Sequence, residues 1–373
     1  MRLLVSCIPF DGGKSGISVY TRGTARALRA RGNELTLLVE PGVTGEDILG
    51  EERAGAGVRV VEAPGWTRRA AASMVWHLFA LPGWVRRHRA EFDGMVICAA
   101  NRRVCARYPL PTAATVHDLA NFRIPGKYSR SRMFYLAHVL PHYAKKAGRL
   151  VAVSAATAAD MERFWGCAAG SVAVLHEGFP EVPAGWTRRA GARNLLYISR
   201  IEHPGKNHVR LVEAYGRLPR ALAEAHPLVL AGADWKDAEV VKSAAAASPH
   251  ADLIRFAGFV PQGAAMEELW GKTAFYVFPS LFEGFGLSLA EAMARGIPCA
   301  CSGNGALAEV AGGAAETFDP EDPADIARAL EQLLGEGETA RAERVKRGLA
   351  RAKEFSWDAH AAGLERLIMG DGR

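Results

Sequence analysis

Two glutamates eight residues apart, Glu283 and Glu291, form the most informative pair of chemical groups in the sequence. Glu283 stands in a glycine-containing loop after an apolar run that ends at Phe278, and Glu291 lies about one turn into a helix predicted over 287–295. Two carboxylates in this arrangement can accept hydrogen bonds from hydroxyls of one ligand, and the amides at the helix start can meet an anion. The alternative, that both carboxylates only cap the helix, stays open on these residues alone.

A glycine loop near the N-terminus is a second candidate ligand site. Gly12, Gly13 and Gly16 follow the first apolar run and precede a helix predicted over 18–31. Small residues there let a phosphate or a sugar approach backbone amides. The pattern is neither a P-loop nor a dinucleotide fingerprint, so a permissive turn is an equal alternative.

A later run, GNGALA at 303–308, matches GxGxxA but lacks the acidic ribose ligand of a following βαβ unit. This absence argues against an NAD enzyme.

Short apolar runs alternate with helical segments along the chain, which predicts an α/β protein with two doubly wound, Rossmann-like domains facing each other across a cleft. The expected strands lie at 1–8, 34–39, 58–61, 95–99, 113–116, 150–153, 195–199, 227–231, 253–256, 274–278 and 298–302. Further helices are expected at 207–217, 263–271 and 323–334. The segment 180–194, rich in Pro, Gly and Arg, separates a domain expected over 1–183 from one expected over 190–355.

The distribution of charge and the cysteine pattern indicate which binding partners and which cellular compartment to expect. Residues 1–186 carry 24 Lys and Arg against 15 Asp and Glu, whereas residues 187–373 carry 22 against 25, so we expect an anionic partner for the first half. The six cysteines form no CxxC pair, which speaks against a zinc or redox site and favours the reducing cytoplasm. No apolar run is long enough to span a bilayer, and no nucleic-acid-binding module is recognisable.

Several ordered motifs together point to one family. The run EGFGLSLAEAMARGIP at 283–298 contains two glutamates in an E-x7-E arrangement, and LYISRIEHPGKN at 196–207 carries an Arg and a Lys after a strand. The other motifs are VHDL at 116–119, VAVS at 151–154 followed by Asp160, and FSW at 355–357. This combination resembles the retaining glycosyltransferases of family 4, the group 1 glycosyltransferases with the GT-B fold. The resemblance also implies that a C-terminal helix at 356–373 crosses back to the first domain.

The resemblance implies a role for each matched residue of the second domain. Arg200 and Lys206 would clamp the diphosphate of a nucleotide sugar and stabilise its growing charge as it leaves. Glu291 would bind the ribose hydroxyls and Glu283 the hydroxyls of the donor sugar. Other donor contacts would come from the loop and helix start at Gly284, Phe285, Gly286 and Leu287.

In the first domain, His117 would touch the donor sugar, and the glycines at 12, 13 and 16 would approach donor and acceptor. With Glu283, Arg200 and Lys206, His117 completes the expected catalytic set. The alternatives are a linker-side salt bridge for Arg200, a solvated loop lysine for Lys206 and a hydrogen-bonded structural histidine for His117. Departures from the family pattern at Lys14-Ser15, at 176–178 (HEG) and at Ser288 weaken the transfer of donor and acceptor detail.

The expected reaction moves a sugar, with mannose or a related hexose as the first choice, from a nucleoside-diphosphate sugar such as GDP-mannose to a glycan or lipid-linked acceptor. The anomeric configuration would be retained, as in polysaccharide and glycoconjugate synthesis by this family. The sequence holds no Asp-x-Asp triplet, so we expect neither a metal nor another cofactor. The alternatives are a sugar-nucleotide epimerase with the same fold and a non-catalytic nucleotide-sugar-binding homologue.

The segment 66–89 combines three tryptophans with arginines at both ends. An apolar body flanked by arginines is typical of a helix that lies in a membrane interface, and a core-facing helix with solvated arginines is the alternative. We therefore expect a cytoplasmic protein with peripheral contact to the inner membrane surface and no nucleic-acid partner.

Overall fold

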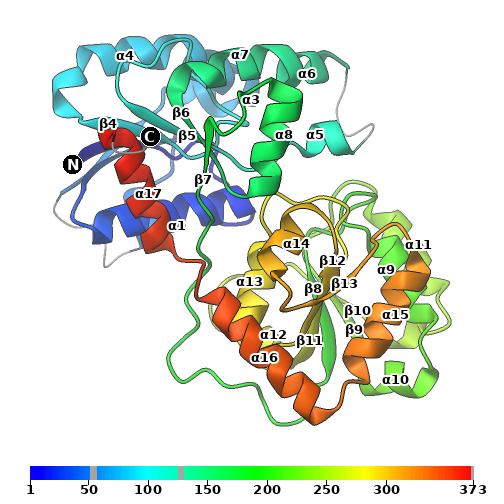
Figure 1. The fold of residues 1–373 in the computed structure, drawn as a ribbon. Coiled ribbons are helices and arrows are strands. Elements are labelled where there is room, and N and C mark those ends of the chain that lie inside the picture. Colours follow the sequence, from blue (N-terminus) through cyan, green and yellow to red (C-terminus); the bar gives the residue numbers. More distant parts are fainter. Residues whose placement is uncertain (51–56, 125–129, 371–373) are drawn as a thin grey trace. The chain divides into compact units, whose positions relative to one another are not determined.

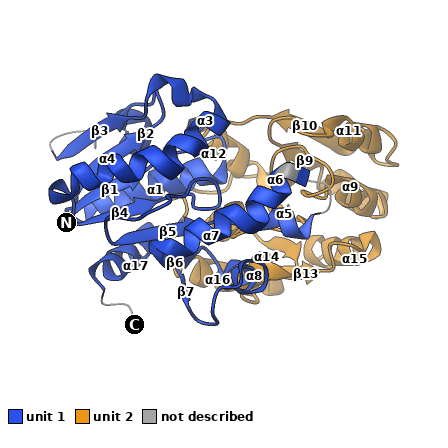
Figure 2. Ribbon diagram, turned by 90° about the horizontal axis from the view of Figure 1, so that it is seen from above, with its two compact units in different colours: residues 1–178, 356–373 blue, residues 179–355 orange. Residues whose placement is uncertain are grey.

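The computed structural model describes residues 1–50, 57–124 and 130–370, and the chain divides into two compact units (Figure 1). Unit 1 comprises Met1–Gly178 and Ser356–Arg373, and unit 2 comprises Phe179–Phe355 (Figure 2). Each unit is built on one parallel sheet with helices between its strands. The predicted fold class, two doubly wound α/β units, is confirmed.

The sheet of unit 1 has the strand order β3-β2-β1-β4-β5-β6-β7. Its strands are β1 (Arg2–Ser6), β2 (Glu34–Val39), β3 (Val58–Glu62), β4 (Gly94–Ile97), β5 (Thr112–Val116), β6 (Gly148–Ala152) and β7 (Val172–Val174). The order reverses between β1 and β4, which pair in parallel with Leu3 opposite Gly94. At such a switch point the connections leave to opposite sides, and the carboxyl ends of the two strands leave room for a ligand.

The helices of unit 1 include the C-terminal one. They are α1 (Gly16–Ala30), α2 (Gly45–Leu49), α3 (Ala70–Val75), α4 (Leu81–Arg87), α5 (Ala120–Arg123), α6 (Arg130–Phe134), α7 (Leu140–Ala144), α8 (Ala155–Trp165) and α17 (Trp357–Met369). Helix α17 packs on α1, and the Tyr20 hydroxyl lies 2.7 Å from Nε2 of His360. A Cβ on Gly23 would lie 2.1 Å from the Trp357 ring, so this close packing requires glycine there.

The sheet of unit 2 has the order β10-β9-β8-β11-β12-β13, with the reversal between β8 and β11. Its strands are β8 (Asn194–Ile198), β9 (Leu228–Ala231), β10 (Ile254–Gly258), β11 (Thr273–Phe278), β12 (Cys299–Ser302) and β13 (Glu316–Phe318). Its helices are α9 (His208–Gly216), α10 (Arg220–Ala225), α11 (Ala238–Ala246), α12 (Ala264–Gly271), α13 (Leu287–Ala294), α14 (Gly305–Ala311), α15 (Pro323–Leu334) and α16 (Glu338–Ala352).

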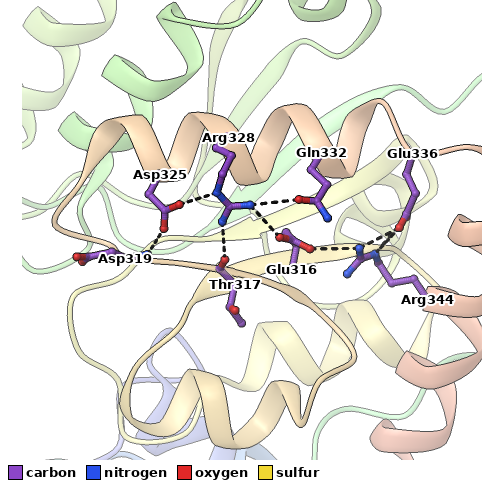
Figure 3. Close-up of polar contacts among 8 residues, drawn as sticks. All are labelled: Glu316, Thr317, Asp319, Asp325, Arg328, Gln332, Glu336 and Arg344. Atoms are coloured by element: carbon purple, nitrogen blue, oxygen red, sulfur yellow. Dashed lines mark hydrogen bonds and ion pairs between the residues drawn. The ribbon is translucent and has the colours of Figure 1, made fainter.

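An ion-pair network ties the edge strand β13 to helices α15 and α16 (Figure 3). Glu316 accepts hydrogen bonds from Arg328 at 3.2 Å and from Arg344 at 3.3 Å. Arg344 also donates to Glu336 at 2.9 Å and is only 7% exposed. A buried guanidinium needs such carboxylate partners, so the network is part of the core of this edge.

The predicted strands and helices match observed elements, usually within one or two residues, but some short elements escaped prediction. Strands β7 and β13 have three residues each and give no apolar run of useful length. The segment 66–89 is not one helix: it consists of a 3-10 helix (Gly65–Arg68), α3, a π-helical stretch (Trp76–Ala80) and α4. None of the helices in the described ranges combines the length and apolar composition needed to cross a bilayer.

Candidate functional site

Lys206 and Glu283 form an ion pair at the switch point of unit 2. Lys206 lies in the loop after β8, and Glu283 lies in the loop after β11, the neighbouring strand. The Lys206 Nζ donates to Glu283 Oε1 at 2.6 Å, and less than a fifth of either side chain is exposed. The reversal of strand order therefore brings two residues that are 77 positions apart into one half-buried polar pair.

The loop that carries Lys206 is fixed by its neighbours. Asn207 adopts a left-handed backbone conformation, with φ 60°, and its Nδ2 donates to the carbonyls of Pro279 at 2.9 Å and Pro320 at 2.7 Å. The buried Tyr197 hydroxyl donates to the Lys206 carbonyl at 2.9 Å. Sequence reasoning missed both residues, although an asparagine directly after Lys206 at a helix start is a visible signal. The loops after β8, β11 and β13 are thus held as one unit.

Arg200 has a different environment from Lys206. Its guanidinium carbon lies 5.0 Å from the centre of the Trp235 ring and a nitrogen lies 3.5 Å from Glu202. The side chain is 43% exposed. An exposed arginine over an aromatic ring is a stable cation that can turn toward an anion in solution. Trp235, in the loop after β9, was not predicted as part of the site.

Glu291 belongs to helix α13, and its side chain is buried: 6% of the residue's surface is exposed. Burial raises the pKa of its carboxyl to about 7, the positive charge of Arg295 opposes the rise, and Glu267 adds to it. Arg295 pairs with Glu267 at 2.5 Å and donates to the Glu291 carbonyl at 3.1 Å. These contacts fix the helix that carries Glu291 against α12.

The start of α13 depends on a glycine. Gly286, the N-cap, has φ 112°, and a Cβ on it would lie 2.6 Å from Leu307. Leu287 and Ser288 are the first two helical residues, whose amides have no partner inside an α-helix. The Ser288 hydroxyl, which stands where the family commonly has proline, accepts a hydrogen bond from Tyr276 at 2.6 Å. The neighbouring Phe285 ring packs against Phe355, and Gly284 precedes it in the loop.

In unit 1, the glycine loop folds around an aspartate that sequence reasoning missed. Asp11 Oδ1 accepts hydrogen bonds from the amides of Lys14 at 3.0 Å and Ser15 at 3.1 Å. Burial raises the pKa of Asp11, but hydrogen bonds from Ser18, Ser15 and Lys14 outweigh it and the net pKa is lowered. Gly12 and Gly13 have φ of 77° and 91°, and Gly16 begins α1. An anion at this loop would compete with Asp11 for the same two amides.

His117 follows β5, and both of its ring nitrogens have protein partners. Nε2 lies 2.7 Å from the Cys98 carbonyl, and Nδ1 lies 3.1 Å from Oε1 of Glu177. Less than a tenth of either side chain is exposed, and the Tyr20 ring meets the imidazole edge-on at 4.5 Å. This geometry fits the structural alternative for His117. The predicted contact with a sugar would use the edge of the ring or replace one of these bonds.

The structure therefore brings Lys206, Glu283 and the start of α13 together in unit 2, with Glu291 one turn further along the helix. His117 and the glycine loop belong to the carboxyl ends of strands in unit 1. In the three described ranges, no group of three or more His, Cys, Asp or Glu side chains is placed to hold a metal ion. The donor-binding and catalytic roles stay predictions.

Comparison with known proteins identifies the family. Residues 14–181 match the model of "Glycosyltransferase Family 4", and residues 180–348 match that of "Glycosyl transferases group 1". O-antigen chain mannosyltransferase B of Escherichia coli is 31% identical over 65% of this chain and 66% of its own length. The serotype-specific mannosyltransferase WbdA of Escherichia coli is 34% identical over 47% of this chain, which covers only 22% of that protein.

Solved structures show the same fold. Sucrose-phosphate synthase from Thermosynechococcus elongatus has a TM-score of 0.74 at 18% identity, with 99% of each chain covered. Anabaena HepE, in complex with UDP and glucose, has a TM-score of 0.72 at 16% identity, with 99% of this chain and 100% of HepE covered. The predicted GT-B fold is confirmed. With two adjoining family models that together span residues 14–348, the chain belongs to the group 1, or family 4, glycosyltransferases.

Proposed function

We propose that this protein transfers a hexose, with mannose as the first choice, from a nucleoside-diphosphate sugar to a glycan or lipid-linked acceptor, with retention of configuration. The observation that carries the proposal is the Lys206–Glu283 pair, with N–O distance 2.6 Å, at a switch point of the sheet. One ammonium group for a diphosphate and one carboxylate for sugar hydroxyls, side by side, suit the two halves of such a donor.

The relatives favour mannose. Both relatives described above are named mannosyltransferases, and the 31% identical one is further named for the O-antigen chain. GDP-mannose is therefore the donor we propose first, and polysaccharide synthesis is the proposed context. The HepE structure with UDP and glucose makes UDP-glucose the donor to compare against it.

The proposed chemistry is electrostatic. As the bond to the sugar breaks, negative charge grows on the leaving diphosphate, and Lys206, Arg200 and the amides at the start of α13 would stabilise it. A carboxylate offers about four acceptor positions, so Glu283 can keep Lys206 and still accept donor hydroxyls. Buried Glu291 would accept the ribose hydroxyls. We propose that these groups act without a metal or another cofactor.

The experiment is a transfer assay in EDTA with GDP-mannose or UDP-glucose and mannose oligosaccharides as acceptors. We expect an elongated glycan whose new linkage keeps the anomeric configuration of the donor by NMR, and loss of product in Lys206→Ala. Lys272→Ala is the matched control, because this exposed lysine of unit 2 forms its ion pair with Glu268, four residues before it, and away from Lys206 and Glu283. A changed nucleotide sugar in the absence of acceptor would indicate an epimerase, and no turnover with bound donor would indicate a non-catalytic homologue.

We also propose that the protein is cytoplasmic and touches the inner membrane surface through unit 1. Trp66, Val75 and Phe79 are 58%, 56% and 60% exposed, and Arg68 and Arg69 beside them are exposed too. Aromatic side chains with flanking arginines suit a surface of anionic lipid. The fraction of protein that sediments with phosphatidylglycerol vesicles should fall in Phe79→Ser. It should stay unchanged in Phe259→Ser, which changes an exposed phenylalanine of unit 2.

A further inference from the structure

Trp235 is a large aromatic residue on the surface of unit 2, beside a residue of the proposed donor site. It lies in the loop between β9 and α11 and is 59% exposed. The guanidinium carbon of Arg200 lies 5.0 Å from the centre of its ring. Because most of the tryptophan faces solvent, packing in the core does not account for it. Its contact with Arg200 is therefore the feature from which a role can be argued.

The backbone keeps Trp235 and Arg200 side by side. The segments that follow β8 and β9 continue the pairing of these strands, and the Trp235 amide donates a hydrogen bond to the Ile201 carbonyl at 2.9 Å. The two segments approach so closely that a Cβ on Gly232 would lie 1.8 Å from the Ser199 carbonyl oxygen, so glycine is required there. The indole is thus fixed to the same stretch of chain that carries the arginine.

An aromatic partner leaves the charge of Arg200 available to a ligand. In the described part of the chain, the nearest carboxylate to its guanidinium is that of Glu202 at 3.5 Å, longer than an N–H···O hydrogen bond of about 2.7–3.2 Å. Asp234, which precedes the tryptophan, is held by Lys242 of α11 at 2.5 Å. A ring attracts a cation through its π-electrons and does not neutralise it as a carboxylate does. Arg200 is therefore restrained and still fully charged.

This restraint has a consequence for binding. The Arg200 side chain is 43% exposed, and an arginine without a partner samples many rotamers in water. Fixing such a side chain on a ligand lowers the affinity, and a side chain that is already held loses less freedom. The indole holds the guanidinium before the ligand arrives.

We infer that Trp235 is a positioning residue, which holds the Arg200 guanidinium over its ring and presents it to the diphosphate of the nucleotide sugar. The inference rests on the proposed function, because it assigns Arg200 a diphosphate to bind. It adds a residue from the loop after β9 to a site that is otherwise built from the loops after β8 and β11 and the start of α13.

A double-mutant cycle tests whether Trp235 acts through Arg200. GDP, with UDP in parallel, is titrated calorimetrically into wild type, Trp235→Leu, Arg200→Ala and the double variant. We expect about two- to fivefold weaker binding in Trp235→Leu, the size of one exposed cation–π contact. Arg200→Ala should bind about tenfold more weakly, and the double variant should bind as Arg200→Ala does. An equal loss from Trp235→Leu in both backgrounds would mean that the indole does not act through Arg200, which overturns the inference.

Two further variants separate the ring from the loop that carries it. Trp235→Phe keeps an aromatic face and should bind the nucleotide more tightly than Trp235→Leu does. Phe256→Leu removes another exposed ring of unit 2, on β10, and should bind as the wild type does. The Tm of each variant shows that the fold is intact. Equal affinities of Trp235→Phe and Trp235→Leu would exclude the ring as the positioning group.

NMR reports the contact without a ligand. Protons that lie over an indole ring are shifted upfield, so the Arg200 side-chain signals should move downfield in Trp235→Leu. Their absence from the spectrum of Arg200→Ala assigns them. Signals that stay in place in Trp235→Leu would contradict the inference.

Failure of this inference is distinguishable from failure of the proposed function. Nucleotide binding to the wild type, with the same loss from Trp235→Leu whether or not Arg200 is present, would keep the donor site and reject the positioning role. No binding of GDP or UDP to the wild type would reject the donor site, and the positioning role with it.

Discussion

Lys206 Nζ lies 2.6 Å from Glu283 Oε1, although 77 positions of sequence separate the two residues. The contact exists because β8 and β11 are neighbours at the place where the order of the sheet reverses. Both side chains are largely shielded from water, so each charge depends on the other more than in a surface pair. The pair is therefore poised to exchange partners when a charged, hydroxyl-bearing ligand arrives.

Because each charge depends on the other, we expect the double variant of this pair to be more stable than the single Lys206 variant. Lys206→Ala leaves the Glu283 carboxylate half-buried and unpaired, and we expect it to lower the free energy of unfolding by about 2 kcal/mol. The double variant Lys206→Ala/Glu283→Gln removes the unpaired charge as well and should recover about half of that loss. Urea unfolding at pH 7.5 measures both, with Lys272→Ala as control. Equal losses in the single and double variants would show that the unpaired Glu283 carboxylate does not destabilise the fold, and would contradict the prediction.

Glu291 predicts a pH dependence of known sign. Its pKa is about 7 in the folded protein against 4.5 for the ordinary carboxyl, so the folded state binds more protons than the unfolded state between these values. The contribution of Glu291 to stability is therefore full below pH 4.5, falls as the pH rises, and is lost above pH 7. Glu291→Gln should remove this dependence and raise the free energy of unfolding at pH 8 by up to about 3 kcal/mol.

The same residue should impose an opposite trend on ligand binding. An ionised carboxylate accepts hydrogen bonds from ribose hydroxyls better than a protonated one, so donor affinity should rise as the pH passes 7. Calorimetric titrations of wild type and Glu291→Gln at pH 6 and 8 test this. Parallel pH profiles in the two proteins would exclude Glu291 as the origin of the trend.

The Glu177–His117 contact predicts that two substitutions of Glu177 lower the stability by different amounts. Glu177→Ala leaves the buried Nδ1 of His117 without its partner and should cost about 1–2 kcal/mol of stability. Glu177→Gln keeps an acceptor oxygen and should lose less than half of that. Glu181→Ala, an exposed glutamate four residues on, is the control. Thermal unfolding gives the comparison, and wild-type stability in Glu177→Ala would mean that the contact is absent in solution.

The network around β13 predicts a large difference between two arginines of one helix. Arg344→Ala leaves Glu316 and Glu336 without their buried partner and should cost about 3 kcal/mol. Arg347→Ala changes an exposed arginine of the same helix and should cost less than about 0.5 kcal/mol. Chemical unfolding of the two variants tests the prediction, which similar losses in both would refute.

Patterns of neighbouring residues predict most helices and strands of this fold, but they do not predict which distant residues contact one another. The run that ends at Phe278, the glycines around Phe285 and the apolar face of α13 are all local signals, so the loop and helix that carry Glu283 and Glu291 were predicted correctly. Strand β13 escaped because three residues at a sheet edge are stabilised by Arg328 and Arg344, which come from helices further along the chain.

The same limit explains the residues missed at the site. Glu177, Asn207 and Trp235 act through contacts with side chains or carbonyls that only the folded sheet brings near. Asp11 differs, because it accepts hydrogen bonds from amides three and four residues further along the chain. Glu177 stands out in the sequence only as a departure from the family pattern. Its pairing with His117 joins the segments that follow β5 and β7, which lie on either side of β6 in the sheet of unit 1, and no spacing along the chain reveals this.

The most direct test of the donor site is an isothermal titration of GDP-mannose, with UDP-glucose in parallel, into wild type, Lys206→Ala and Lys272→Ala. We expect saturable binding of one nucleotide sugar to the wild type and to Lys272→Ala, and at least tenfold weaker binding to Lys206→Ala, because a charged hydrogen bond to the diphosphate is lost. Equal affinity in Lys206→Ala and wild type, or no binding of either nucleotide sugar to the wild type, would contradict a donor site at the Lys206–Glu283 pair.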